Sequence, residues 1–188
     1  FDNTTVANGY NQNPAGTGFT YTGAAGIARD TGTGDDIPAP LNGSQVGYIT
    51  DTGAISFNFT TPSNQTSDVY GFSFKALSKV GDRQNVRVSL DYGTGHQVDI
   101  TAKSYSQGNG YTMPDETQIS NWQARVVAWT TSAYYYTRSF NLTAGSTHSI
   151  TIVGTKTGGQ TAFFNDVRVT SVDAIFAGVI PGGGEATG

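Results

Sequence analysis

The 188 residues carry a formal net charge of −4, and their ten Lys and Arg side chains are spread over the whole length. This balance excludes the basic surface that nucleic acid and anionic membranes require, and no apolar run is long enough to span a membrane. Only 13% of the residues are charged, 36% are hydrophobic and 25 are glycine. This composition fills one core and favours strands joined by polar turns, so we expect one all-β domain.

Apolar and polar residues alternate along most of the chain, which is the pattern of half-buried strands. The alternation is clearest at Ile55–Thr60 and Tyr70–Lys75. We expect strands at 1–6, 19–22, 46–50, 55–60, 70–75, 85–91, 97–101, 135–142, 149–153 and 162–170. About ten short strands separated by Gly-rich turns indicate a sandwich or a barrel.

Two segments depart from this rhythm. Lys103–Ala128 is too long for a hairpin turn, and loops of that length in a compact domain are often functional. The segment 179–188 carries three consecutive glycines behind Pro181, a composition typical of flexible linkers. We therefore expect a single domain at 1–178 and a Gly-rich linker or tail at 179–188, next to other domains of a parent chain.

The order of several blocks indicates a family. Phe140–Gly145, His148–Ile152 and Thr161–Val167 follow one another in the last third of the chain, and Ala39–Ile49 and Tyr70–Ala76 precede them. These blocks resemble the strands of the galactose-binding-domain-like jelly rolls, the superfamily that holds many carbohydrate-binding modules. The resemblance implies an antiparallel β-sandwich with jelly-roll topology, and a polysaccharide or oligosaccharide as the partner.

The same resemblance implies a structural calcium ion that joins the first and last strands. Asp2 and Asp166 lie at the matching positions. Calcium takes six to eight oxygen ligands from carboxylates and carbonyls, so we expect Asp2 and Asp166 to be metal ligands. The alternative is that both are ordinary solvated strand residues.

Sugar binding calls for exposed aromatic rings, which stack on the C–H faces of sugars, beside polar side chains that reach the hydroxyls. Aromatic residues of the long segment and polar residues behind the Phe72 strand meet this description. The candidate ligand-binding residues are Trp122, Tyr111, Tyr105, Asn121, Arg125, Trp129, Lys79, Arg83 and Gln84. The alternatives are that Trp122 caps the edge of the core and that the last three form an ordinary hairpin end.

The run Tyr134-Tyr135-Tyr136 cannot place all three side chains on one face of a strand. The parity of Phe140 and Leu142 points Tyr134 and Tyr136 inward unless a bulge intervenes.

Catalytic motifs are absent from the sequence. There is no cysteine, no His-Glu-x-x-His and no Gly-x-Ser-x-Gly, so we expect no enzyme. The leading hypothesis is a non-catalytic carbohydrate-binding module that targets an exported multidomain protein, such as a polysaccharide-degrading enzyme, to a glycan. Two alternatives stay open: a structural or adhesive domain of a bacterial surface or matrix protein, and a jelly-roll polysaccharide lyase.

The low charge, the missing cysteine and the excess of Thr, Gly and Asn are typical of bacterial exported proteins. We therefore expect a secreted or cell-surface location, and a monomer.

Overall fold

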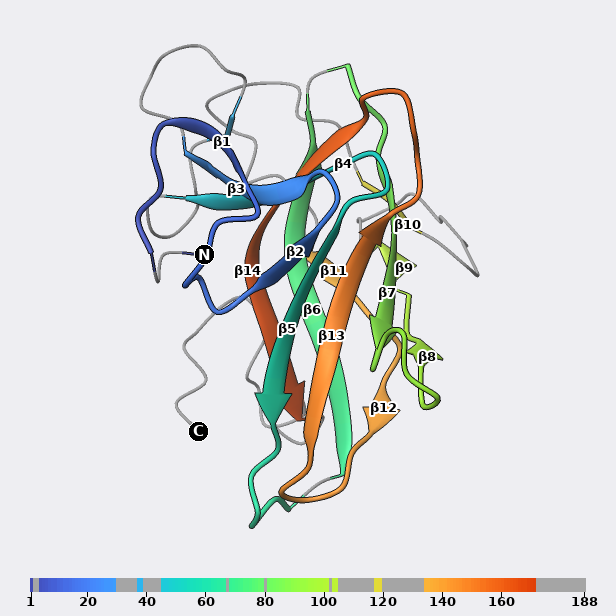
Figure 1. The fold of residues 1–188 in the computed structure, drawn as a ribbon. Helices are drawn as coiled ribbons and strands as arrows, with labels where there is room; N and C mark the ends of the chain where they lie inside the picture. The colour runs from blue at the N-terminus through green and yellow to red at the C-terminus, as the bar shows by residue number, and fades with distance from the viewer. Residues whose placement is uncertain are drawn as a thin grey trace.

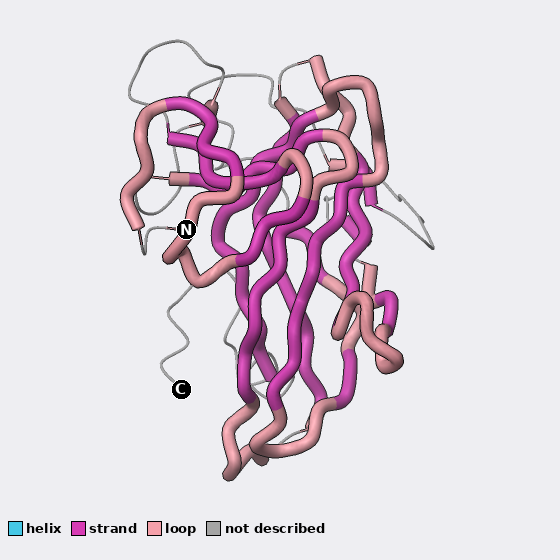
Figure 2. Tube along the Cα trace, in the orientation of Figure 1, coloured by secondary structure: helices cyan, strands magenta, loops and turns pink. Residues whose placement is uncertain are grey.

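The computed structural model describes residues 1, 4–29, 37–38, 45–66, 68–79, 81–101, 103–104, 117–119 and 134–171. Every regular element within these ranges is a strand (Figure 2). The strands are β1 (Gly9–Gln12), β2 (Thr20–Thr22), β3 (Ala25–Arg29), β4 (Val46–Thr50), β5 (Ala54–Thr60), β6 (Val69–Ser78), β7 (Asn85–Leu90), β8 (Val98–Asp99), β9 (Lys103–Ser104), β10 (Thr117–Gln118), β11 (Tyr134–Tyr136), β12 (Phe140–Asn141), β13 (Thr147–Gly154) and β14 (Thr161–Ser171). The described ranges hold no helix long and apolar enough to cross a bilayer.

The strands form two sheets that lie face to face (Figure 1). The larger sheet has eight strands in the order β1-β3-β4-β14-β6-β11-β9, with β12 paired to β6. The smaller has six in the order β10-β7-β13-β5-β2, with β8 paired to β7. Each of these pairs is antiparallel. The predicted antiparallel β-sandwich is therefore confirmed, although the described residues form fourteen strand segments rather than about ten.

The core lies between the sheets and is rich in aromatic rings. Phe72 and Phe74 of β6 are buried, and their rings lie 5.4 Å apart. Tyr135 of β11 stacks on Phe74 at the same centroid distance, and Phe57 of β5 reaches Phe72 from the opposite sheet at 5.8 Å. Each such side chain contributes about 1.5–3 kcal/mol by its burial, so these rings fix which face of each strand points inward.

The tyrosines of β11 do not follow the predicted parity. Tyr135 is buried in the core, so alternation turns the next residue, Tyr136, towards the outer face of the sheet. The strand breaks at residues 137–139 before Phe140 re-enters the core in β12. This irregularity is the exception that the parity argument allowed for, and it leaves Tyr136 pointing outward. The side chain of Tyr134 lies outside the described part of the chain.

The amino-terminal segment is held by a side chain rather than by a strand ladder. Residues 1 and 4–8 form no strand, so the strand predicted at 1–6 is wrong. The buried Gln45 amide donates to the carbonyls of Phe1 (3.0 Å) and Thr4 (2.9 Å) and accepts from the Val6 amide (2.6 Å). The Phe1 ring stacks on Phe19 at 4.4 Å. One glutamine thus supplies the hydrogen bonds that a neighbouring strand would have supplied.

Candidate functional site

The outer surface of the larger sheet carries a row of short and polar residues along β6. Because Phe72 and Phe74 point into the core, alternation turns Gly71, Ser73 and Lys75 to the opposite face. We call Gly71, Ser73 and Lys75 the outer strip. Lys75 and Ser73 are 8% and 3% exposed, which is unusual for polar side chains on the outside of a sheet.

Longer side chains flank the outer strip on both neighbouring strands. Ser73 pairs with Tyr136 of β11 on one side and with Arg168 of β14 on the other. Tyr136 and Arg168 are partly exposed, so the short side chain of Ser73 lies between two longer side chains. A Cβ atom placed on Gly71 would meet no atom of the described residues within 4 Å. The face is therefore open above Gly71, next to an aromatic ring and a guanidinium group.

Charges of both signs meet around Lys75. The Arg168 Nε donates to the Asp166 carboxylate at 2.7 Å. Burial lowers the pKa of Lys75, and the nearby Asp166 carboxylate partly opposes this effect. Asp166 has a φ of 52° and lies where the register of β14 against β6 shifts, between Asn165 and Arg168. This bulge brings the carboxylate to the outer strip.

Two buried polar atoms next to the strip have no hydrogen-bond partner. They are the Ser73 Oγ and the Asn165 Nδ2. Asn165 is 5% exposed and pairs directly with Lys75 in the sheet. Each such orphaned group costs about 1–3 kcal/mol, and buried polar groups are otherwise almost always satisfied.

An exposed aromatic ring lies farther along the same face. Tyr10 of β1 is 39% exposed and meets Tyr48 edge-on at 5.0 Å. The Lys79 Nζ lies 5.8 Å from the centre of the Tyr10 ring, within the range of a cation–π contact. This end of the outer face is covered by the buried cluster of Ala28, Ile37, Val46, Tyr48, Leu77 and Phe163. The predicted Lys79 thus belongs to the outer face of the larger sheet, next to a tyrosine that sequence reasoning missed.

Gln84 has a structural role in this arrangement. Its amide nitrogen, Nε2, donates to the carbonyls of Asp51 (2.9 Å) and Gln160 (2.7 Å). Its Oε1 accepts from the backbone amides of Asn85 and Lys156, both at 3.0 Å. With two donors and two acceptors engaged, the buried amide has no group left for a sugar hydroxyl. Gln84 instead ties three loops together at one end of the sandwich.

Of the other predicted ligand-binding residues, the structure describes Arg83 alone. Arg83 is exposed at the same end, where its backbone amide donates to the Gln160 Oε1 at 2.6 Å. The rest of the set lies outside the described residues and stays a prediction: Trp122, Tyr111, Tyr105, Asn121, Arg125 and Trp129.

Only one of the two predicted calcium ligands, Asp166, lies in the described part of the chain. Asp2 lies outside it. The Asp166 carboxylate is paired with Arg168 and has the Lys75 ammonium group nearby, and such cationic neighbours compete with a metal ion. Among the described residues, no group of three His, Asp or Glu side chains is arranged to hold a metal. Calcium binding stays a prediction. The pairing of Asp166 with Arg168 counts against it.

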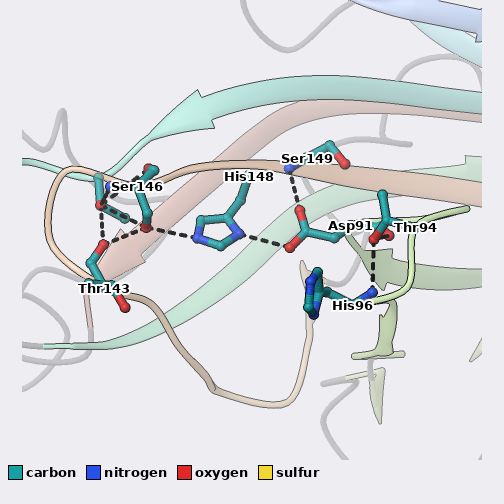
Figure 3. A network of polar contacts seen from close by, with 8 residues as sticks. Asp91, Thr94, His96, Thr143, Ser146, His148 and Ser149 are labelled. Carbon is teal, nitrogen blue, oxygen red and sulfur yellow. Dashed lines mark hydrogen bonds and ion pairs between the residues drawn. The ribbon is translucent and has the colours of Figure 1, made fainter.

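A second polar cluster lies where β7 ends and β13 begins (Figure 3). The His148 Nδ1 contacts the Asp91 Oδ2 at 2.8 Å, and the His148 Nε2 contacts the Ser146 Oγ at 2.8 Å. The Ser149 amide donates to the other Asp91 oxygen at 3.0 Å. Because a carboxylate only accepts, Nδ1 carries a proton. The order of groups is that of a serine, base and orienting acid.

The surroundings of Ser146 give no support for hydrolysis. Its hydroxyl lies 2.5 Å from the Thr143 carbonyl, which competes with His148 for the single hydroxyl proton. The Ser146 amide donates to the Thr61 Oγ1 at 3.0 Å, and the Gly145 amide donates to the Pro62 carbonyl at 3.2 Å. These two amides are therefore not available to stabilise an oxyanion. The cluster ties the ends of β5, β7 and β13 together, and sequence reasoning missed it because its residues are distant in the chain.

Comparison with solved structures establishes the fold class. One similar structure is that of TmCBM61 in complex with β-1,4-galactotriose, with 10% identity, 82% of this chain and 89% of that chain covered, and a TM-score of 0.50. Another is the CBM22-1 xylan-binding domain of Xyn10C from Paenibacillus barcinonensis, with 10% identity, 89% and 98% covered, and a TM-score of 0.50. The chain has the jelly-roll fold of carbohydrate-binding modules. The sequence matches no protein-family model and no curated protein.

The jelly-roll fold that the resemblance implied is therefore confirmed. A shared fold at 10% identity does not carry a ligand with it. The function must therefore be argued from the outer strip and its neighbours.

Proposed function

We propose that the chain is a non-catalytic carbohydrate-binding module, and that the outer face of its larger sheet is the glycan-binding surface. The observation that carries this proposal is the open space above Gly71, which lies two residues along β6 from Ser73 and its partly exposed neighbours Tyr136 and Arg168. A glycan chain needs a surface that its rings can approach, an aromatic side chain and polar groups for its hydroxyls. This face offers all three.

Different residues of this face would make different contacts with a glycan. Gly71 leaves space for a sugar ring to approach the sheet. The rings of Tyr136 and Tyr10 provide apolar surface near the middle and at the far end of the face. Arg168 and Lys79 carry N–H groups that hydrogen-bond hydroxyl oxygens. The outward-facing residues of β6 between Gly71 and Lys79 are 8% exposed or less, so the accessible part of this strand is the space above Gly71.

The most direct test fills the space above Gly71 with a large side chain. Gly71→Tyr places a large ring where no atom of the described residues lies within 4 Å, and Asn58→Tyr makes the same addition at an exposed position of β5 on the other sheet. Affinity electrophoresis against soluble plant, algal and microbial polysaccharides compares both variants with the wild type. We expect wild-type retardation by one polysaccharide class, with a dissociation constant of about 10 μM to 1 mM, lost in Gly71→Tyr and kept in Asn58→Tyr.

A further variant tests the alternative that the long segment Lys103–Ala128 holds the binding site. Trp122→Ala removes the central aromatic residue of that segment. Retardation that survives Gly71→Tyr but is lost in Trp122→Ala moves the site to the long segment. Retardation by no polysaccharide contradicts the proposed function and favours a structural or adhesive domain.

The cellular setting is part of the proposal. We infer a secreted or cell-surface protein in which this module, as a monomer, raises the local concentration of a neighbouring domain on its glycan. Repeating the electrophoresis with EDTA tests the calcium prediction, because a metal that holds the fold or the site together would make retardation sensitive to the chelator.

A further inference from the structure

Lys75 and Asn165 are buried polar residues that face each other across two strands. They are directly opposite in the register of β6 and β14, and each is at most 8% exposed. Alternation places both on the outer face, because their neighbours Phe74 and Phe164 lie in the core between the sheets. Residues in this relation have Cβ atoms about 5 Å apart, so the flexible stem of the lysine can bring its amine to the asparagine side chain.

The carbonyl group of the Asn165 side chain is oriented and polarised. Its Oδ1 accepts from the Asp166 backbone amide at 2.7 Å. Because a backbone amide only donates, this contact fixes which end of the side chain is the oxygen. The same N–H group would stabilise negative charge on Oδ1 when a nucleophile adds to Cγ. The Nδ2 at the other end has no hydrogen-bond partner among the described residues, so no such contact there resists its departure as a leaving group.

An attack on this carbonyl also requires a neutral amine and a group that moves a proton. Burial lowers the pKa of Lys75, so its neutral form is more populated than that of an exposed lysine. The Asp166 carboxylate is near enough to Lys75 to oppose this shift in part. One of its oxygens accepts from the Arg168 Nε at 2.7 Å. A carboxylate has lone pairs on both oxygens, so the group can still take up a proton and pass it on.

We propose that Lys75 and Asn165 form an intramolecular isopeptide bond that cross-links β6 to β14. The Lys75 Nζ attacks the Asn165 Cγ and forms a C–N bond. The Asp166 carboxylate takes a proton from Nζ and delivers it to Nδ2, the bond between Cγ and Nδ2 breaks, and ammonia leaves. One amide replaces another, so the reaction needs no oxidant, reductant or co-reactant. It is independent of glycan binding, because every reacting group belongs to the chain itself.

The structure describes the chain before this reaction, with Nδ2 still in place. Lys75 makes a further contact, so the attack requires its side chain to rotate towards Asn165. Rotation of a side chain is fast compared with amide chemistry, so this contact lowers the rate of the reaction without blocking it. Only the unreacted chain keeps a Lys75 amine that titrates, and experiments on that amine therefore use protein taken before the bond has formed.

The mass of the intact protein tests the bond. We expect the wild type, incubated until its mass stops changing, to be lighter than its sequence by one ammonia molecule. Trypsin would then fail to cleave after Lys75, and the fragment 157–168 would be joined to the fragment that contains Lys75. Joined fragments distinguish the isopeptide bond from ammonia lost by cyclisation of an asparagine elsewhere in the chain.

Variants identify the reacting groups. Asn165→Ala and Lys75→Arg each remove one of them and are expected to keep the full mass of their sequences. Asp166→Asn removes the carboxylate, and Asn tolerates the positive φ of this position. We expect this variant to cross-link about a hundredfold more slowly, measured as the cross-linked fraction at successive times after synthesis. Lys156→Arg changes an exposed lysine and is expected to lose ammonia like the wild type.

The outcomes decide the proposal without a glycan. A folded wild type that keeps its full mass after long incubation overturns it, and so does a mass loss that persists in Asn165→Ala or maps to fragments without Lys75. Equal rates in Asp166→Asn and the wild type overturn the role of Asp166 in proton transfer. If a variant fails to fold, the fragments of the wild type still identify the joined residues. None of these results bears on the carbohydrate-binding module, which the electrophoresis tests separately.

Discussion

The outer faces of the two sheets both carry hydroxyl groups, but only the larger sheet carries a buried one without a partner. On the smaller sheet, the hydroxyls of Ser56 and Thr151 lie 2.9 Å apart, and Thr60 and Thr147 form a second pair at the same distance. On the larger sheet, the Ser73 hydroxyl has no partner. The paired hydroxyls of the smaller sheet recover in the fold what they lose to solvent, whereas the buried Ser73 hydroxyl of the larger sheet costs stability. Thr50 and Thr161 of the larger sheet are also paired, at 2.8 Å, so the difference lies in the buried Ser73 hydroxyl and not in every polar group of the face.

The largest expected effect concerns the most completely paired buried polar side chain described above. Gln84→Ala removes four hydrogen bonds at once and leaves the Asp51 and Gln160 carbonyls without that donor. We expect a loss of about 3 kcal/mol in the free energy of unfolding, measured by urea denaturation. A loss below about 1 kcal/mol would show that water replaces the amide and would weaken the distinction between paired and unpaired groups.

The second prediction concerns the buried charge on the larger sheet. Because burial lowers the pKa of Lys75, the folded protein holds this proton less tightly than the unfolded chain does. Between the lowered pKa and the ordinary value of 10.5 the unfolded state binds more protons, so this residue makes stability rise with pH there. Lys75→Met lacks the titrating group. We expect the stability of the wild type relative to this variant to increase as pH approaches 10.5, in urea denaturation at several pH values. A difference independent of pH would show that Lys75 is well solvated.

A smaller effect is expected on the paired face of the smaller sheet. Thr151→Val keeps the shape of the side chain but leaves the Ser56 hydroxyl without its partner at 2.9 Å. We expect a cost of about 1 kcal/mol in unfolding free energy. The double variant Ser56→Ala/Thr151→Val completes a thermodynamic cycle whose coupling energy measures the pair directly. A coupling energy of zero would remove the contrast between the two faces.

The smallest effect has the opposite sign. Ser73→Ala removes a hydroxyl that is buried and unpartnered. We expect thermal denaturation to show stability unchanged or raised by a few tenths of a kcal/mol, because the cost of the orphaned group disappears. A clear loss of stability would mean that Ser73 has a partner in solution, such as an ordered water molecule.

The fold was largely predictable where alternation is strong. Val46–Thr50 has the predicted bounds, and β5, β7 and β13 begin or end within two residues of the expected positions. Alternation failed at β1 and β3, since Ala25-Gly26-Ile27-Ala28 has little of the branched and aromatic character typical of strands. Gly26 is required there for another reason: a Cβ atom would collide with the Asn11 carbonyl of β1. Such close approach between strands leaves no periodic signal in the sequence.

The candidate site was less predictable than the fold. Lys79 was found because it follows a recognisable strand, but Ser73 and Asn165 look like ordinary polar positions. Their juxtaposition depends on the register of β14 against β6 and on the shift between Asn165 and Arg168. A shift by one residue would turn Asn165 into the core, and nothing in the local sequence fixes that register.

Gly154 and Gly71 are expected to differ in the number of substitutions that they tolerate. Gly154 of β13 lies so close to the Asp51 carbonyl that any side chain would collide with it, whereas Gly71 has open space above it. In a library of all single substitutions, Gly154 would be intolerant under selection for folded protein alone. Gly71 would accept nearly every residue under that selection and become restrictive only when the library is selected for glycan binding. A paired selection of this kind, run on a mixture of polysaccharides, would map the binding surface before the sugar is identified.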